Sequence, residues 1–397
     1  MFKPKSNLVQ ELQSRGYIHQ CTNIEKLDKL ATKKKLVSYI GFDCTAESLH
    51  VGSLIQLMLI RILQKNSHQV IALLGGGTSK IGDPSGKDKS RQLLNEKEIK
   101  NNSQNIRKNI EKFTIKKNNV KKIKFFDNSI WLDNINYINF LRTYGKNVSV
   151  NKMLSMDSIS ERLKREQPLS FLEFNYIIIQ AYDFVELNNR ENCEVQFGGS
   201  DQWGNITAGV DLVRRINKKE VVGLTTPLIT TPSGDKMGKT SKGAVWLSKK
   251  LLSSNGYWQF WRNVDDKDVI KFLKLFTDIE VEKINNLKNK SSNEINNNKK
   301  ILADEATILC HGKNQADNFV IKKKDLDKGI EAFKIISLNK KIIQSNSESR
   351  RLIRGGAVKF NGKLITNELE IFSEKNIKNN IIKISIGRKN HFIVKVV

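Results

Sequence analysis

The sequence contains few cysteines and no long apolar stretch. Its 397 residues include four cysteines, with no Cys-x-x-Cys pair and no histidine–cysteine cluster, so we expect neither disulfides nor structural zinc. No apolar run approaches the ~18 residues that a membrane-spanning helix needs, and residues 1–20 lack the apolar segment of a secretory signal. Repeats of the solenoid type are missing too. We therefore expect a cytoplasmic protein with no membrane partner.

The chain is also short of acidic residues. Its 68 lysines and arginines outnumber 41 aspartates and glutamates, which gives a formal net charge of +27. Such an excess favours a polyanionic partner, either nucleic acid or a membrane surface, because clustered basic side chains release counterions when they bind phosphates. Runs rich in Lys, Asn and Ile, such as 296–301 and 375–383, could equally arise from genome composition. Charge alone leaves both explanations open.

The best-defined feature is a strand–loop–helix unit at residues 36–62. Its first five residues predict a buried strand, residues 41–48 a turn, and apolar positions every three or four residues from Leu54 a helix. His50 and Gly52 stand where this helix begins, and unpaired N–H groups at such a place favour an anion such as phosphate. Taken alone, His50 is better interpreted as a capping or packed histidine.

Strand signals recur further along the chain. A strand predicted at 70–74 completes a strand–helix–strand unit, which implies a right-handed crossover in a parallel sheet. Strand signals resume only at 194–197 and again at 221–234, so the aromatic-rich helices between about 120 and 190 are an insertion. The polar, helix-rich section 91–117 shows little functional signal. The pattern predicts an α/β, Rossmann-like parallel-sheet domain with a nucleotide at its carboxyl edge.

Two further domains are expected after the sheet. We expect the Rossmann-like domain to span 1–245, an all-helical basic domain to span 246–325, and a linker with a small α+β module to span 326–397. The connection near residues 322–327 is short. The last module contains a capping box before a short helix, and then a hairpin turn, signalled by Ser345, Glu348, Asn361 and Gly362.

Three loops carry polar groups suited to ligands. The loop 82–87 and Arg91 set a carboxylate beside basic side chains, which suits an amine and a phosphate, although a surface turn explains it equally well. In 197–205, two glycines precede a carboxylate and an amide at a helix start, which favours a ribose site over a structural turn. The third loop could close over phosphates or be a solvated basic linker, and contains Lys236, Lys239 and Thr240.

One predicted helix, at 171–184, carries three polar side chains on an otherwise apolar surface. Their spacings of four and three residues place them on one face. Polar groups there are costly unless a polar ligand or an internal network satisfies them, and we favour the ligand. The three are Tyr176, Gln180 and Asp183.

Together these segments resemble the class I aminoacyl-tRNA synthetases, and among them the bacterial tyrosyl type. Residues 49–53, Leu-His-Val-Gly-Ser, resemble the family's HIGH motif, and 236–240, Lys-Met-Gly-Lys-Thr, resemble its KMSKS motif. The resemblance covers essentially the whole chain, and the last module is similar to the alpha-L RNA-binding motif. It implies a tyrosine-tRNA ligase that forms tyrosyl-adenylate and pyrophosphate from tyrosine and ATP, then transfers tyrosine to the 3′-terminal adenosine of tRNA(Tyr).

The resemblance also implies roles for individual side chains. The phenol hydroxyl of tyrosine would be held by Tyr39 and Asp183, and its ammonium group by Asp83, Tyr176 and Gln180. ATP and the adenylate would contact Gly52, Ser53, Asp201, Gln202 and Lys239. The catalytic set serving the phosphates would be His50, Thr45, Lys236, Lys239 and Thr240, with Lys87 and Arg91 nearby. ATP would be a substrate with Mg²⁺, and neither a tightly bound cofactor nor a protein metal site is implied.

Partners follow from the same resemblance. The inserted helices would form a homodimer interface, and the helical domain with the terminal module would hold tRNA(Tyr) through phosphates and shape. Catalysis would come from positioning and from charge stabilisation by the lysines, His50 and Mg²⁺, without a covalent enzyme intermediate. Two positions depart from the family pattern. Ser53 replaces the second histidine of HIGH, and Cys44 replaces a proline, which predicts a looser turn.

Two alternative functions compete with this one. The first is a tryptophanyl-type synthetase, and Tyr39 with Asp183 and the terminal module argue against it. The second is an RNA-binding protein that keeps the synthetase shell without activity, for example a splicing or regulatory factor. Retention of both loop lysines and the whole amino-acid pocket argues against that one.

The replacement of the motif histidine by Ser53 leads to a first prediction. We expect Ser53 to tune the rate of adenylate formation without abolishing it, because one phosphate or ribose contact is weakened. The variant Ser53→His should therefore form adenylate faster, as measured by ATP–pyrophosphate exchange. An unchanged rate would indicate a compensating contact elsewhere.

Overall fold

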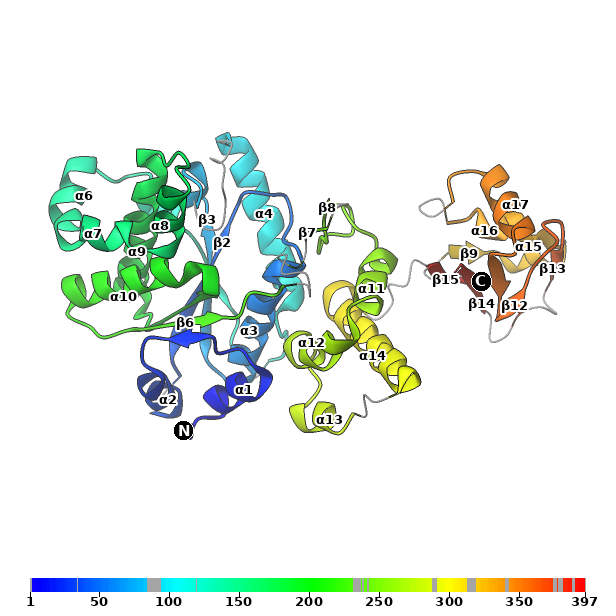
Figure 1. Cartoon of the computed structure of the whole chain (residues 1–397), viewed down its shortest axis with the longest axis horizontal. Helices are drawn as coiled ribbons and strands as arrows, with labels where there is room; N and C mark the ends of the chain where they lie inside the picture. Colours follow the sequence, from blue (N-terminus) through cyan, green and yellow to red (C-terminus); the bar gives the residue numbers. More distant parts are fainter. Residues whose placement is uncertain are drawn as a thin grey trace. The chain divides into compact units, whose positions relative to one another are not determined.

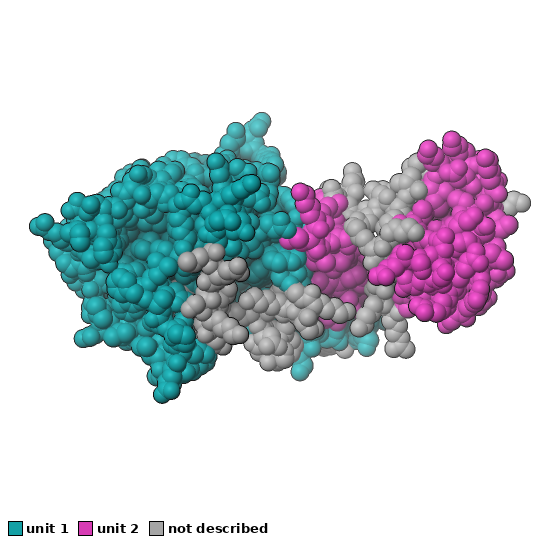
Figure 2. Space-filling model, turned by 90° about the horizontal axis from the view of Figure 1, so that it is seen from above, with its two compact units in different colours: residues 1–248, 265–298 teal, residues 249–264, 299–397 magenta. Residues whose placement is uncertain are grey.

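The computed structural model describes residues 2–33, 35–83, 94–118, 120–230, 237, 239–240, 243–287, 291–312, 319–339, 343–373, 377, 381–387 and 390–396 (Figure 1). Contacts group the chain into two compact units (Figure 2). Unit 1 contains residues 1–248 and 265–298, and unit 2 contains 249–264 and 299–397. Among the described residues, no helix is both long and apolar enough to span a membrane. The three-domain division remains a prediction.

Unit 1 is built on a six-stranded sheet with the order β1-β6-β5-β2-β3-β4. All neighbours pair in parallel except β1, which runs antiparallel to β6. The parallel α/β sheet predicted from the sequence is therefore confirmed. The strands are β1 (Gln20–Cys21), β2 (Val37–Asp43), β3 (Gln69–Gly75), β4 (Lys124–Asp127), β5 (Val195–Gly199) and β6 (Val222–Thr226).

Strand β4 is a correction to the sequence analysis, which placed no strand between residues 74 and 194. It pairs in parallel with β3 over Lys124 to Asp127 and forms the edge of the sheet. The four residues are only half-buried or exposed, and lysines precede them at 121 and 122, so no apolar alternation marks the strand. The helical insertion therefore begins only after β4.

Helices cover both faces of the sheet (Figure 1). The crossovers β2–α3–β3 and β3–α4–β4 step one way along the sheet and β5–α10–β6 steps the other way, so right-handed connections put α10 on the opposite face. The helices are α1 (Asn7–Arg15), α2 (Ile24–Lys33), α3 (Leu54–Lys65), α4 (Glu96–Phe113), α5 (Ser129–Leu132), α6 (Tyr137–Thr143), α7 (Val150–Leu154), α8 (Asp157–Lys164), α9 (Phe171–Glu191), α10 (Trp203–Asn217), α12 (Val269–Phe276) and α13 (Val281–Asn285).

The ends of α9 follow from local sequence chemistry. Ser170 and Glu173 form a capping box at its start, and Asn192 ends it in the left-handed conformation. The buried face of α9 packs against α10 and the sheet, and the rings of Phe184 and Tyr39 meet at 5.2 Å. Helix α9, the longest of the inserted helices, is thereby packed against strand β2.

Unit 2 contains a small sheet with the strand order β12-β11-β14-β15-β9. The predicted turn is confirmed, with φ of 50° at Asn361 and 88° at Gly362 in the hairpin. Of the predicted capping box, the Ser345 side chain accepts from the N–H of Glu348 as expected, whereas the Glu348 side chain accepts from the N–H of Gln344 rather than from that of Ser345. The segment expected to be a short connection contains helix α15 (Lys323–Asp327).

The strands of unit 2 are β9 (Phe319–Ile321), β10 (Ile330–Glu331), β11 (Val358–Phe360), β12 (Lys363–Leu364), β13 (Ile371–Phe372), β14 (Ile381–Ile386) and β15 (Asn390–Val396). Its helices are α11 (Ser254–Arg262), α15 (Lys323–Asp327), α16 (Ala332–Ile336) and α17 (Asn346–Arg354), and α14 (Ser292–His311) begins in unit 1.

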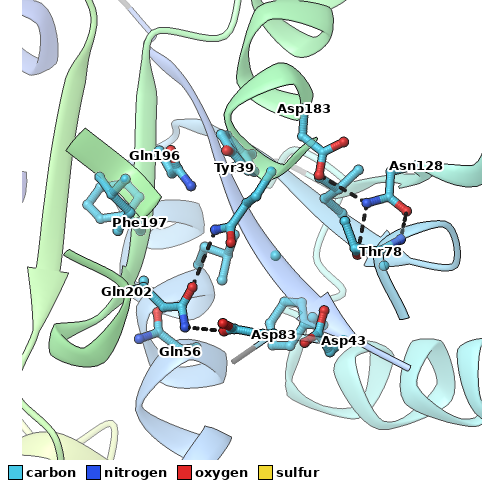
Figure 3. Close-up of a pocket in the computed structure, with 18 of the residues that line it drawn as sticks. Tyr39, Asp43, Gln56, Thr78, Asp83, Asn128, Asp183, Gln196, Phe197 and Gln202 are labelled. Carbon is cyan, nitrogen blue, oxygen red and sulfur yellow. Dashed lines mark hydrogen bonds between the residues drawn. The ribbon is translucent and has the colours of Figure 1, made fainter. Parts of the chain in front are cut away.

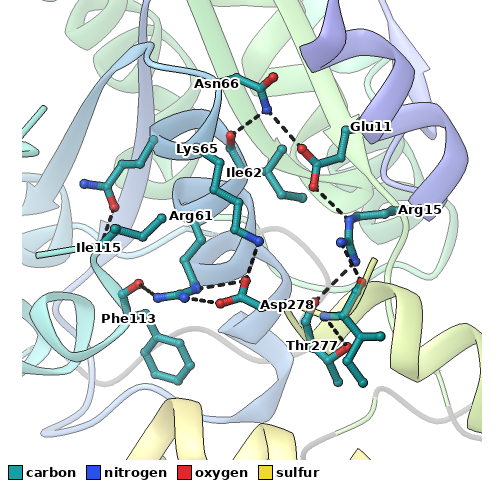
Figure 4. Close-up of polar contacts among 12 residues, drawn as sticks. Glu11, Arg15, Arg61, Ile62, Lys65, Asn66, Phe113, Ile115, Thr277 and Asp278 are labelled. Atoms are coloured by element: carbon teal, nitrogen blue, oxygen red, sulfur yellow. Dashed lines mark hydrogen bonds and ion pairs between the residues drawn. The ribbon is translucent and has the colours of Figure 1, made fainter. Parts of the chain in front are cut away.

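A cluster of charges attaches the end of α12 and the segment after it to the body of unit 1 (Figure 4). Arg61 and Lys65, one turn apart on α3, both pair with Asp278. Arg15 of α1 donates to the backbone oxygens of Lys274 at 2.9 Å and Ile279 at 2.9 Å. Burial alone would raise the pKa of Asp278, but the hydrogen bonds and charges of its two basic partners outweigh burial and lower that pKa.

The lowered pKa of Asp278 gives a stability prediction. Because the folded pKa lies below the unfolded one, the pair stabilises the protein above about pH 4 and loses its effect as the pH falls through the folded pKa. We expect Asp278→Asn to lower the free energy of unfolding by about 1 to 3 kcal/mol at pH 7. Urea denaturation should show this difference shrinking below about pH 4.

The matched control for this variant is Glu280→Gln, two residues away. Glu280 and its partner Lys283 are both well exposed, with side-chain exposures of 67% and 72%, so this substitution should leave the unfolding free energy almost unchanged. A loss for Asp278→Asn that persists unchanged at acid pH would contradict the assignment to the ion pairs.

Candidate active site

A cavity of about 180 Å³ lies at the carboxyl ends of the central strands (Figure 3). Strand β2 contributes Tyr39 and Asp43 to its wall, and helix α9 contributes the three polar residues expected on one face. This placement confirms the geometry that their spacing predicts. The lining also includes Asp83, Gln56, Gln196 and Gln202.

The inner end of this cavity is a carboxylate, Asp183, held by two donors. Trp131 Nε1 donates to its Oδ1 at 2.8 Å, and Asn128 Nδ2 donates to its Oδ2 at 3.0 Å. The side chain of Asn128 also donates to Thr78 Oγ1. Burial raises the pKa of Asp183 to about 7, even though both hydrogen bonds act to lower it. Near neutral pH this carboxyl group is therefore poised between its two protonation states.

Several polar atoms around the cavity are buried without a hydrogen-bond partner among the residues that the structure describes. They are Tyr39 Oη, Gln56 Oε1, Gln180 Oε1 and Gln196 Oε1, all from residues that line it. Leaving a buried polar group unpaired costs about 1 to 3 kcal/mol. An internal network therefore satisfies Asp183 but not its neighbours, and the cavity is suited to a ligand with its own polar groups.

The outer end of the cavity carries a second carboxylate. Gln202 Nε2 donates to Asp83 Oδ2 at 2.7 Å, and Gln180 Nε2 approaches Gln202 Oε1 at 3.4 Å (Figure 3). The hydroxyl of Tyr176 donates to Asp43 Oδ1 at 3.3 Å. Carboxylate and amide oxygens gathered in this way suit a cationic group.

A second, larger cavity of about 510 Å³ adjoins the first one. Gly41, Phe42, Asp43, Gln56 and Gly199 line both, so the two are neighbouring parts of one site. The predicted residues that line the second cavity are Thr45, His50, Gly52, Ser53 and Asp201. Gln202 instead lines the first cavity, beside Asp83.

His50 combines the capping role and a place in the second cavity. Its Nδ1 accepts from the N–H of Gly52 at 3.0 Å, so the neutral ring carries its proton on Nε2. The N–H of Ser53 is bonded to the oxygen of His50. These two amides, expected to be open to an anion, are therefore already paired. A Cβ on Gly52 would lie 2.6 Å from His50 Cε1, so only glycine fits beside the ring.

Residues 245–247, which follow the loop that contains Lys236, Lys239 and Thr240, are hydrogen-bonded to residues 49–51 around His50. Val51 N–H donates to Val245 O and Leu247 N–H donates to Leu49 O, both at 2.9 Å. Strand β7 (Lys239–Thr240) pairs with β8 (Gly243–Ala244) just before it. The side chains of Lys239 and Thr240, and all of Lys87, Arg91 and Lys236, lie outside the described residues.

The expectation of a looser turn at Cys44 is not met. Its backbone N–H donates to Ser79 Oγ at 2.7 Å, and its oxygen accepts from Asn102 Nδ2 at 3.0 Å. Proline lacks the N–H and could not make the first bond. Cysteine at this position ties the turn to its surroundings.

Several site residues escaped the sequence analysis. Thr78, Asn128 and Trp131 surround Asp183, and the last two follow the unrecognised strand β4. The sequence signal that could have revealed Asn128 is its position directly after strand β4, at the carboxyl edge of the sheet. The other missed lining residues include Asp43, which borders both cavities, Gln56 and Gln196 in the first cavity, and Trp246 in the second.

Comparisons with known proteins agree with this architecture. Residues 31–322 match the family model described as class I tRNA synthetases (W and Y). A tyrosine-tRNA ligase of Pelagibacter ubique is 51% identical, covering 99% of this chain and 100% of that protein. That of Rickettsia bellii is 46% identical over 98% and 99%. A truncated mitochondrial tyrosyl-tRNA synthetase of Aspergillus nidulans has a TM-score of 0.70 at 30% identity, covering 79% and 92%.

The match over residues 31–322 identifies the chain as a class I aminoacyl-tRNA synthetase, and the parallel sheet with a two-part site at its carboxyl edge agrees with that class. Within that class, the chain belongs to the tryptophan and tyrosine family, in its bacterial tyrosyl branch.

Proposed function

We propose that the protein is a tyrosine-tRNA ligase. It would activate L-tyrosine with ATP to tyrosyl-adenylate and pyrophosphate, and then transfer tyrosine to the 3′-terminal adenosine of tRNA(Tyr). The observation that carries this proposal is the inner end of the first cavity, where the Asp183 carboxylate and the buried hydroxyl of Tyr39, which has no partner among the described residues, line one pocket. The phenol hydroxyl of a bound tyrosine can donate a hydrogen bond to Asp183 and accept one from the hydroxyl of Tyr39.

The remainder of the cavity fits the rest of the amino acid. Asp83, with Tyr176 and Gln180 nearby, would hold the ammonium group at the outer end. Phenylalanine would fill the same volume but leave Asp183 and Tyr39 without the ligand's hydroxyl, which costs binding energy because both groups are buried. Discrimination would therefore come from unpaired polar groups rather than from size.

ATP would occupy the second cavity, as a substrate accompanied by Mg²⁺, with no tightly bound cofactor. Thr45, His50, Gly52 and Ser53 would face the phosphates or ribose, and Asp201 would bind the ribose. The tyrosine carboxylate would attack the α-phosphate, and the His50 Nε2–H would donate to the charge that develops there. Lys236, Lys239 and Thr240 are proposed to act on the same phosphates, with Lys87 and Arg91 nearby.

The partners are proposed on separate observations. Large apolar side chains on the inserted helices are exposed, among them Phe171 at 71%, Ile138 at 62% and Ile130 at 58%, which favours a homodimer interface there. Arginines 351 and 354 lie in the last turn of α17 in the terminal module, which favours tRNA binding by unit 2. All four cysteines are free thiols, consistent with work in the cytoplasm.

The activity is tested by ATP–pyrophosphate exchange with individual amino acids. We expect exchange with tyrosine, and a rate with phenylalanine lower by at least about 100-fold, because phenylalanine offers no partner to the buried Tyr39 hydroxyl and no further donor to Asp183. Exchange with tryptophan only would favour the tryptophanyl alternative. No exchange with any amino acid would favour an RNA-binding protein without synthetase activity.

The raised pKa of Asp183 predicts a pH dependence of tyrosine binding. A phenol donating to the carboxylate favours its charged form, so binding lowers a pKa that is about 7 in the empty protein. Binding near pH 6 should release close to one proton and binding near pH 8 almost none, and the dissociation constant should rise as the pH falls below about 7. Calorimetry in two buffers of different ionisation enthalpy measures the release.

The control is Asp183→Asn, which removes the titrating group. Its tyrosine affinity should be weaker at every pH and nearly constant between about pH 6 and 8. Wild-type binding at pH 6 without proton release would contradict a direct contact between the phenol and Asp183.

A further inference from the structure

Helix α4 reaches the nucleotide side of the site, although the sequence analysis found little functional signal in it. Its buried face contains two asparagines, Asn102 and Asn109, exposed by only 9% and 4%. Ile106, between them, lines the second cavity. The helix is therefore close enough to influence that cavity while contributing none of the predicted catalytic residues.

The side chain of Asn109 is bonded at both of its ends. Its Nδ2 donates to the oxygen of Asn105 at 2.9 Å, which fixes the amide so that Oδ1 faces away from α4. That oxygen accepts from Ser48 Oγ at 2.8 Å and from the N–H of Leu49 at 3.2 Å. One buried oxygen thus holds the two residues that precede His50.

Leu49 is anchored on its other side as well. Its oxygen accepts from the N–H of Leu247 at 2.9 Å, in the bridge that joins the His50 segment to residues 245–247. The backbone of Leu49 is therefore fixed through its N–H by α4 and through its oxygen by the segment after β8. Without the Asn109 oxygen, the Leu49 N–H would be buried and unpaired, and the chain would have to shift to find another acceptor.

We propose that Asn109 is a positioning residue for the nucleotide cavity. By binding Ser48 and Leu49, Asn109 fixes the position of the His50 backbone beside the second cavity. Because His50 Nδ1 accepts from the N–H of Gly52, Asn109 also influences the turn at Gly52. This inference rests on the proposed function, since it assumes that the second cavity binds ATP. Residues 44–49 do not line the first cavity, so the effect of Asn109 is confined to the nucleotide.

The test compares two substitutions at this position in the full-length protein. Asn109→Leu keeps the volume of the side chain and removes the acceptor, whereas Asn109→Asp keeps an acceptor oxygen for Ser48 and Leu49 but loses the Nδ2 donor to Asn105 O. We expect Asn109→Leu to weaken ATP binding and lower kcat/KM for ATP by about 10- to 100-fold, because small displacements of reacting groups have effects of that size. Tyrosine affinity should stay within about twofold, and Asn109→Asp should recover part of the loss, because it restores the acceptor but not the donor to Asn105 O.

Asn188→Leu is the matched control. Asn188 is 1% exposed, donates to Cys193 O at 2.7 Å and accepts from Asn217 at 2.8 Å, but lines neither cavity. It should cost similar stability in urea denaturation without the selective loss of ATP affinity. Equal losses for ATP and tyrosine, an equal ATP defect in Asn188→Leu, or no recovery by Asn109→Asp would each overturn the positioning role.

Two further measurements keep the outcome clear. ATP affinity is measured by equilibrium dialysis without an amino acid, so it reports on Asn109 even if exchange with tyrosine fails and the proposed function falls. If Asn109→Leu does not fold, Ser48→Ala removes only the hydroxyl, which is 2.8 Å from both Asn109 Oδ1 and the oxygen of Leu49. It should reproduce the same split at about threefold, and equal effects on both ligands would count against the proposal.

Discussion

The two-part site depends on the pairing of β2 with β3 on one side and with β5 on the other. Seven residues of β2 are in register with β3, from Val37 to Asp43, and three with β5. Backbone hydrogen bonds on both sides leave the strand no freedom to slide, because a slip of one residue would turn Tyr39 to the opposite face. The strand places Tyr39 at the inner end of the first cavity and Asp43 at its border with the second.

The site also contains buried polar groups that lower the free energy of unfolding, and the packing of the surrounding core has to compensate for this loss. Burial raises the pKa of Asp183, and the nearby hydroxyl of Tyr39 has no hydrogen-bond partner within the described part of the chain. Each such group lowers stability, but the same burial makes a polar ligand selective, since only a ligand with a matching hydroxyl relieves the cost. The rigid α9, capped at both ends and packed on α10, holds these groups in place.

Much of this arrangement could be predicted from the sequence, because it follows from local spacing. The parallel sheet follows from alternating strand and helix signals, and the shared face of Tyr176, Gln180 and Asp183 follows from helical periodicity. The short edge strand β4 could not be predicted in this way, because it is half-exposed and follows a basic stretch. Missing it also hid Asn128 and Trp131, whose role depends on Asp183 more than 50 residues away.

The same limit explains why α4 carried no signal. Asparagines spaced along a polar helix are typical of a solvated surface, and only tertiary contacts distinguish Asn102 and Asn109 from their exposed neighbours. Once folded, α4 binds backbone groups of the turn from Cys44 to Leu49, and residues 245–247 bind the opposite side of Leu49 and Val51. His50 is therefore supported by segments about 60 residues after it and nearly 200 residues after it. The recognisable motif supplies the chemical group, whereas unrecognisable, distant backbone contacts set where that group lies.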